Sequence, residues 1–361
     1  MIAAFEQAGL IVLERGWLSS NNILFGAANP DHETVLVDTG YWTHAPQTVA
    51  LVRRLLGDRP LQRIVNTHLH SDHCGGNHAL QQAYGCAVDV PAGEADKVDR
   101  WDETRLTYRE TGQGCPRFER TGVLQADTEI ELAGRRWQVI ASPGHDPESM
   151  VLYEPELELL ISADALWENG FGIVFPELES GSGFDAVGAT LDRLAALRVR
   201  AVIPGHGPAF DDFSGALARA RRRFDALVAD PSRHARHAAK VMIKFHLMEL
   251  QSQPRDALVT WLEANALIAG VHRLHFGDVS FESWFDALIG ELCASGRGDG
   301  GALISGTPRT VLPPRGRGLK KKPPRLCGDL YLRAKLTSSQ ARESRDNPRL
   351  NAFCRVAPSV R

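Results

Sequence analysis

Short apolar runs separated by turn residues dominate the first part of the chain. Runs at 10–15, 22–28 and 34–38 are divided by polar turns, a pattern typical of a meander of strands. Residues 42–56 instead place apolar side chains at helical spacing, and 61–65 form another strand-like run. This region therefore predicts a sheet with a helix beside it.

Strands and helices continue to residue 228. Two hairpins are predicted around Gly134 and Pro155, which gives a second sheet. A strand at 201–203 lies between the helical patterns of 184–197 and 215–228. The pattern indicates a mixed α/β (α+β) domain over residues 1–228.

The pattern changes after this domain. Residues 229–294 are mainly helical and predict a small C-terminal domain, with a winged-helix form as one option. From residue 295 to 361 the chain is rich in Gly, Pro, Ser and Arg and has few clustered apolar residues, which predicts a disordered tail.

Charge is distributed unevenly between the body and the tail. Residues 294–361 contain 15 Lys or Arg against 4 Asp or Glu, whereas the first 293 residues contain 26 against 40. A basic tail can bind nucleic acid or an acidic partner by neutralising phosphate or carboxylate charge, and it can equally serve as a solvated extension. It lacks the interleaved aromatic residues that stack on single-stranded bases.

The densest group of polar side chains is the sequence HLHSDH at 68–73. A strand-like run precedes it and a helix-like run at 77–84 follows, so it lies on a strand-to-helix loop where side chains can converge. Imidazole nitrogen and carboxylate oxygen suit zinc or a similar divalent metal. The candidate ligands here are His68, His70, Asp72 and His73.

Three more candidate ligands follow apolar runs farther along the chain. They are His145 in PGHD, Asp164 in SADA and His206 in PGHG. Taken singly, a His after Pro-Gly is also typical of a turn, and an Asp at a strand end is also typical of a helix cap. Their order after the first cluster favours a shared metal site.

HLHSDH, PGHD, SADA and PGHG in this order resemble the metallo-β-lactamase superfamily, and most closely its glyoxalase II-like branch with two metals. The resemblance covers about residues 10–225 and implies a four-layer αββα sandwich with the metals at one edge. It implies that His68, His70 and His145 hold one ion, that Asp72, His73 and His206 hold the other, and that Asp164 bridges them.

The resemblance also implies roles for two aspartates. Asp38, in VDTG, is expected beside the metal loop in the second coordination shell, and its alternative role is to cap the next helix. Asp72 is the candidate catalytic residue, because it can orient the nucleophile as well as bind metal. Substrate-binding residues are not identified. Trp101, Tyr108 and Phe118, in or beside the long loop predicted at 105–120, either line the pocket or pack locally.

The expected activity is that of a hydrolase. Two divalent ions, zinc by preference and iron or manganese as options, would share a bridging hydroxide that attacks an ester-type bond, a thioester or lactone, in a small-molecule substrate. Two alternatives remain open, a ribonuclease Z-like phosphodiesterase and a mononuclear-iron persulfide dioxygenase. The flavin-linked di-iron branch has a Glu where His70 stands, and the chain shows no close match to a glutathione-binding basic cluster.

The cellular setting is expected to be the cytoplasm. The six cysteines form no CxxC pair, which is typical of reduced thiols, and the N-terminal stretch lacks the features of a signal peptide. We expect no membrane-spanning segment, because no apolar run approaches the ~18 residues that a span requires. Cys74, beside His73, is interpreted as a packing residue, and the pattern does not indicate an oligomeric state.

Overall fold

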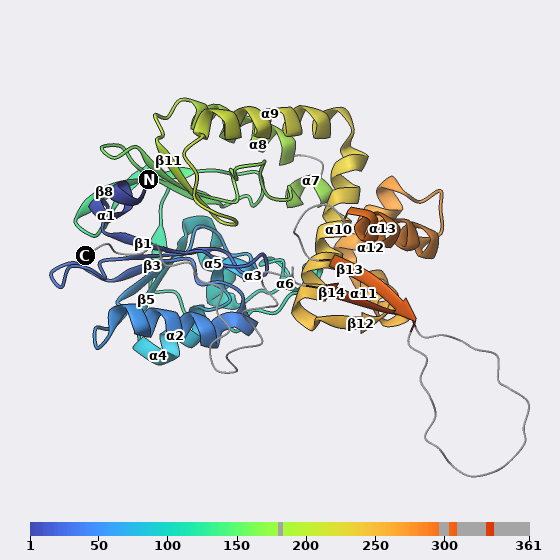
Figure 1. Cartoon of the computed structure of the whole chain (residues 1–361), viewed down its shortest axis with the longest axis horizontal. Helices are drawn as coiled ribbons and strands as arrows, with labels where there is room; N and C mark the ends of the chain where they lie inside the picture. Colours follow the sequence, from blue (N-terminus) through green and yellow to red (C-terminus); the bar gives the residue numbers. More distant parts are fainter. Residues whose placement is uncertain (180–182, 296–302, 309–329, 336–361) are drawn as a thin grey trace, which may run out of the picture. The chain divides into compact units, whose positions relative to one another are not determined.

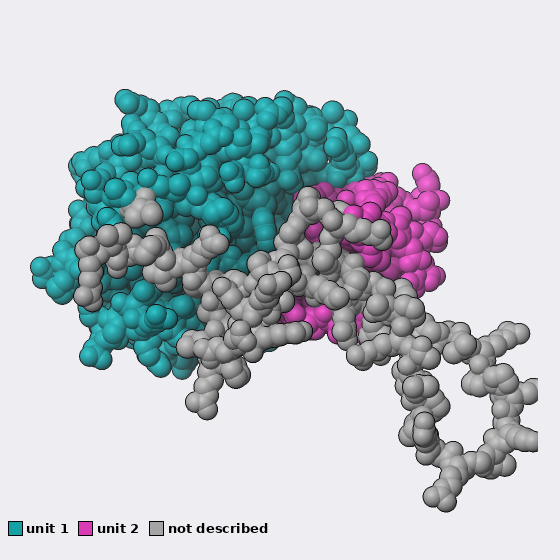
Figure 2. Space-filling model, viewed as in Figure 1, with its two compact units in different colours: residues 1–235, 352–361 teal, residues 236–351 magenta. Residues whose placement is uncertain are grey.

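A computed structural model describes residues 1–179, 183–295, 303–308 and 330–335 of this protein. The described residues divide into two compact units, one of residues 1–235 and the other of residues from 236 onward (Figure 2). The division falls within helix α10 (Pro231–Leu250), a few residues after the boundary that the sequence predicted at 228.

The first sheet of the first unit has six strands in chain order, β1 to β6 (Figure 1). The opening strands form the predicted antiparallel meander, and β3 through β6 then run parallel to one another. The last two strands had not been predicted. The bounds are β1 (Leu10–Leu13), β2 (Asn22–Phe25), β3 (Val35–Val37), β4 (Arg63–Val65), β5 (Ala87–Pro91) and β6 (Gly122–Leu124).

The second sheet has five strands in the order β11-β10-β9-β8-β7. The two predicted hairpins are present as antiparallel pairs, and β11 joins β10 in parallel. Every residue of β9 and β10 is buried, which explains their continuous apolar runs. The bounds are β7 (Thr128–Leu132), β8 (Arg135–Ala141), β9 (Met150–Glu154), β10 (Leu159–Ala163) and β11 (Ala201–Pro204).

The two sheets pack face to face, with helices on their outer faces. Phe25 and Val65 of the first sheet share one buried cluster with Trp137 and Ile203 of the second. A second cluster joins the outer face of the first sheet to helices α2 (Ala45–Leu56) and α4 (Asn77–Tyr84). A third joins the second sheet to α8 (Gly183–Ala195) and α9 (Phe213–Ala229). This arrangement confirms the four-layer αββα sandwich (Figure 1).

Helix α2 shows how the sequence pattern produces this packing. Thr48, Val52 and Leu56 recur every four residues and are buried, so they form one stripe that faces the sheet. Pro46 lies in the first turn, where the absence of its N–H breaks no intrahelical bond. The remaining elements of the unit are short, and the sequence had anticipated few of them. They are α1 (Ile2–Gln7), η1 (Trp42–His44), α3 (Ser71–Cys74), η2 (Ala92–Glu94), α5 (Ala95–Arg100), α6 (Tyr108–Thr111) and α7 (Phe175–Glu179).

The second unit combines helices with a small sheet. After α10 come α11 (Arg255–Ala264), α12 (Ala266–His275) and α13 (Phe281–Ser295). A three-stranded antiparallel sheet has the order β12 (Ser252–Pro254), β14 (Leu330–Lys335) and β13 (Leu303–Pro308). The sequence predicted no regular structure beyond residue 295, so β13 and β14 correct that prediction. The remainder of the predicted tail lies outside the described residues.

Among the helices that the structure describes, none combines the length and the apolar composition that crossing a bilayer would require.

Candidate metal centre

The seven predicted ligands come from loops that follow strands of both sheets. His68 and His70 follow β4, and Asp72 and His73 lie in the short helix α3. The other three, His145, Asp164 and His206, follow β8, β10 and β11 of the second sheet. All seven converge on one edge of the sandwich, where three overlapping groups of ligand atoms each lie within 4.8 Å of one another.

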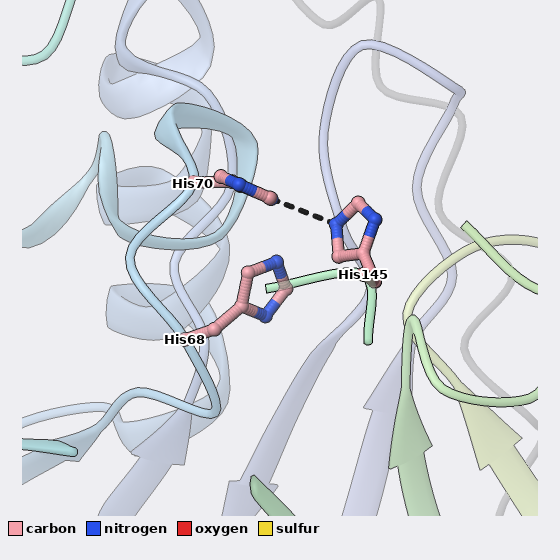
Figure 3. Close-up of side chains that lie close together, drawn as sticks. All are labelled: His68, His70 and His145. Atoms are coloured by element: carbon pink, nitrogen blue, oxygen red, sulfur yellow. Dashed lines mark hydrogen bonds between the residues drawn. The ribbon is translucent and has the colours of Figure 1, made fainter. Parts of the chain in front are cut away.

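The first group consists of three buried imidazoles, His68, His70 and His145 (Figure 3). Nδ1 of His70 lies 2.7 Å from Nε2 of His145, and Figure 3 marks this contact with a dashed line. Nε2 of His68 is buried and has no hydrogen-bond partner among the described residues. Three imidazoles that present nitrogen atoms to a common point match the ligand chemistry of zinc.

The second group contains Asp72, His73 and His206. Nε2 of His206 lies 3.1 Å from Oδ2 of Asp72. Nε2 of His73, like that of His68, is buried without a hydrogen-bond partner in the described part of the chain. A buried polar atom without a partner is unfavourable, so both nitrogens fit a site that a bound cation completes.

Asp164 lies between the two groups. Its Oδ2 is 3.4 Å from Nε2 of His145 and 3.8 Å from Nε2 of His206, and its Oδ1 is 3.5 Å from Nε2 of His73. Trp167 donates a hydrogen bond from Nε1 to Oδ1 of Asp164 at 3.1 Å. The carboxylate therefore faces candidate ligands from both groups, and its bridging role stays a prediction.

Gly205 and Gly172 allow these close approaches. A Cβ atom on Gly205 would lie 2.1 Å from Oδ1 of Asp164, and one on Gly172 would lie 2.4 Å from Nδ1 of His145. Both distances are shorter than a nonbonded contact, so any larger residue would displace a ligand.

Burial keeps the first group neutral. Desolvation is the largest effect that lowers the pKa values of His70 and His145 to about 4, and it lowers the pKa of His68 well below its usual range. Neighbouring imidazoles add to the effect at His68 and His145. Neutral imidazoles carry the free lone pairs that metal ligation requires.

The carboxylates of the centre remain ionised. Burial opposes the charged form of Asp164, but His206 and His73 outweigh it and hold its pKa well below the usual value. The same balance, with His73 and His206 again opposing burial, lowers the pKa of Asp72. Burial also disfavours the charged form of His73, yet Asp38 and the other two carboxylates raise its pKa well above 6.5. The centre thus concentrates negative charge that suits cations.

Asp38 lies behind His73. Its Oδ2 accepts hydrogen bonds from Nδ1 of His73 at 2.7 Å and from the hydroxyl of Thr67 at 2.8 Å, and its Oδ1 accepts one from the backbone N–H of Thr67 at 2.9 Å. Its φ of 56° lies in the left-handed region, which is strained for a non-glycine residue. A carboxylate in this position sets the ring orientation and the tautomer of a metal-binding histidine.

A loop between β1 and β2 anchors the second group, although its residues read only as a polar turn in the sequence. The N–H of Ser20 donates to the carbonyl of Asp72 at 2.9 Å. The side-chain amide of Asn21 donates to the carbonyls of Pro204 and Gly207 at 2.9 and 2.7 Å, on both sides of His206. The loop therefore holds the backbone at two of the three ligands.

Two roles were left open for the aromatic residues near the predicted loop, and the structure shows the second of them, local packing. Trp101, Tyr108 and Phe118 belong to the buried cluster beneath the first sheet, and the Trp101 and Phe118 rings meet edge to face at 5.4 Å. Cys74 is buried against Tyr108 and Cys115, with sulfur-to-hydroxyl and sulfur-to-sulfur distances of 3.1 and 3.8 Å, which agrees with a packing role. The aromatic rings beside the ligands are Trp17, Trp167 and Phe175.

Comparison with known proteins agrees with this geometry. The pattern of the metallo-beta-lactamase superfamily matches residues 15–206, just over half of the chain. A hydroxyacylglutathione hydrolase of Hyphomonas neptunium is 36% identical over 115 residues, which is 32% of this chain and 38% of that protein. Its counterpart in Rhizobium meliloti is 32% identical over 137 residues, covering 38% of this chain and 44% of the relative.

The matched stretch therefore spans less than half the length of either curated relative. A beta-lactamase domain protein from Burkholderia ambifaria aligns in structure with 82% of this chain and 89% of its own, at 20% identity and a TM-score of 0.49. The match over residues 15–206, which contains all seven candidate ligands, shows that this chain belongs to the metallo-beta-lactamase superfamily.

Proposed function

We propose that this protein is a hydrolase with two divalent metal ions that cleaves an ester-type bond, most readily a thioester or a lactone. The observation that carries the proposal is the position of Asp164 between the two ligand groups, with its carboxylate oxygens 3.4 Å from Nε2 of His145 and 3.5 Å from Nε2 of His73. The curated relatives named hydroxyacylglutathione hydrolase add support for thioester chemistry.

In this proposal the two ligand groups would hold different ions, and one carboxylate would also orient the nucleophile. His68, His70 and His145 would hold one ion, and the group containing Asp72 would hold the second. Bound divalent ions activate water as a nucleophile at neutral pH and polarise a carbonyl oxygen. Asp72 would orient the attacking water, because its carboxylate lies in the second group and its pKa is held below the usual value.

The metal would be zinc by preference. Five imidazoles and two carboxylates form a donor set that zinc binds well and that iron or manganese also accepts. A complete second group argues against a mononuclear-iron dioxygenase, which would not need Asp72, His73 and His206 together.

The second unit and the basic tail have separate proposed roles. Helices with a three-stranded sheet support a winged-helix-like domain. Binding of nucleic acid or an acidic partner through the tail stays a prediction, as does a cytoplasmic location. Free thiols at the four cysteines that lie in the described residues support a reducing compartment.

The proposal can be tested with purified protein loaded separately with zinc, iron or manganese. We expect elemental analysis to give about two ions per chain, and a panel of thioesters, lactones, phosphodiesters and β-lactams to show the highest kcat/KM for a thioester or lactone. A reproducible content of one ion would contradict the two-metal centre. A preference for phosphodiesters would favour the ribonuclease Z-like alternative.

A further inference from the structure

Trp17 is exposed beside the candidate metal centre although its loop is firmly held. Its side chain is 56% exposed, the largest fraction for any aromatic residue in the described part of the chain. Leu18 to Asn21, which follow it, are all buried, and hydrogen bonds join Ser20 and Asn21 to the ligand loops. The exposed indole therefore has a fixed position.

The neighbours of Trp17 place it over the second ligand group. Its ring stacks on the imidazole of His206, with centroids 5.4 Å apart and planes 6° apart. Its ring also meets Trp167 at 5.5 Å and 72°, and Trp167 in turn binds Asp164. One face of Trp17 thus covers a candidate metal ligand, and more than half of its surface is open to solvent.

An aromatic ring also lies beside the first group. Phe175, which is half-buried, meets the imidazoles of His70 and His145 at centroid distances of 4.9 and 5.6 Å. The polar centre is therefore flanked by aromatic surface next to each ligand group. A substrate whose reacting carbonyl reached the centre would bring its substituents against these rings.

We propose that Trp17 is a specificity-determining residue that receives an apolar, preferably aromatic, group of the substrate. This inference rests on the proposed function and narrows its substrate class to thioesters or lactones with a hydrocarbon substituent. Covering the exposed indole with apolar surface is favourable in water, and aromatic pairs gain further from stacking. A small polar substituent would gain neither from apolar burial nor from aromatic stacking.

A purely structural role for Trp17 makes a different prediction. Nδ1 of His206 is buried without a hydrogen-bond partner among the described residues, so stacking by Trp17 and Trp167 also orients this ring. If orientation were its only role, loss of Trp17 would weaken metal retention or lower kcat equally for every substrate. If Trp17 instead recognises an apolar group, its loss would raise KM only for substrates that carry such a group.

The test compares wild type, Trp17→Ala and Trp17→Phe on matched thioesters. One pair shares an acetyl group and differs in the thiol, benzyl mercaptan against mercaptoethanol. The other shares mercaptoethanol and differs in the acyl group, phenylacetyl against acetyl. We expect Trp17→Ala to raise KM for at least one aromatic substrate about 10-fold more than it raises KM for acetyl mercaptoethanol, while any change in kcat or metal content is common to all three substrates. Trp17→Phe should restore most of the lost affinity.

An equal change in KM for all three substrates, or no change in KM for any of them, would overturn the inference. Trp42→Ala is the matched control, because Trp42 is also exposed, at 38%, and its ring lies against Gly114. If wild-type protein hydrolyses neither thioesters nor lactones, the proposed function fails separately. Equilibrium dialysis of benzyl methyl thioether against the metal-loaded proteins then tests Trp17 alone: weaker binding by Trp17→Ala supports the inference, and equal binding or no binding refutes it.

Discussion

Replacing Asp164 with Asn tests the shared ligand, because it removes the charge and keeps the size and shape of the side chain. The Asn oxygen can still accept the hydrogen bond from Trp167, now 3.1 Å long, and position 164 directly follows the fully buried strand β10. We therefore expect a folded protein whose defect lies in the metal centre.

The expected size of the defect follows from the distances. Ligand atoms of His145, His73 and His206 lie 3.4, 3.5 and 3.8 Å from the Asp164 carboxylate, and a unit charge about 3.5 Å from that carboxylate would interact with it by about 5 kcal/mol at an effective dielectric constant of ~20. A 100-fold weakening of metal binding corresponds to only about 2.7 kcal/mol. Loss of the Asp164 charge is therefore sufficient even if the neighbouring ligands make up part of the difference. We expect metal affinity and turnover to fall at least ~100-fold.

The assay combines metal titration with single-substrate kinetics and a circular dichroism spectrum. Asp89→Asn is the matched control, since Asp89 pairs with Arg63 at 3.2 Å and belongs to none of the ligand groups. His78→Ala is a second control, because its Nδ1 binds the carbonyl of Arg117. Full metal content and activity in Asp164→Asn, or equal losses in the controls, would refute the assignment of Asp164.

Three further outcomes follow from the structure. Asn21→Ala removes both donors to the carbonyls that flank His206, so affinity for the second ion should fall about 10- to 100-fold in a metal titration, and unchanged affinity would contradict this role. Burial is the main reason why the pKa values of His70 and His145 are lowered to about 4 in the native state. Below pH 6.5 these two histidines therefore bind more protons in the unfolded chain than in the native state. The free energy of unfolding of metal-free protein should therefore fall between pH 6.5 and 4 in urea titrations, with the raised pKa of His73 adding no slope there, and a flat profile would contradict the shifts. Deleting residues 296–361 removes β13 and β14 but no strand of the first unit, so metal content and hydrolysis should persist, and their loss would show that the tail supports the catalytic unit.

The candidate ligands could be proposed from the sequence because their pattern is local. Four of them lie within six positions, and each of the others follows an apolar strand, so residue type and position together mark them as candidates. The long apolar runs of β9 and β10 were predictable for the same reason, since burial on both faces leaves a continuous signal.

Features that depend on distant partners were not predictable. Asn21 has the sequence signal of an ordinary turn residue, and only the fold brings it to carbonyls more than 180 positions away. The roles of the aromatic residues stayed open for the same reason, because only the fold shows that Trp101 and Phe118 pack against each other and that Trp17 stacks on His206. The short strands β13 and β14 lie in a stretch whose Gly- and Pro-rich composition masks their local pattern.

The origin of the ligands in both sheets has a consequence for folding. Ligands from His68 to His206 enclose well over a hundred residues, so ions held between them would act as cross-links that close a very long loop in the chain. The two halves of the sandwich must dock before the complete set of ligands exists, so the ions would bind the native state far better than any partly folded state. Metal supply would then determine how long the folded enzyme survives, and chelation would lower its melting temperature as well as its activity.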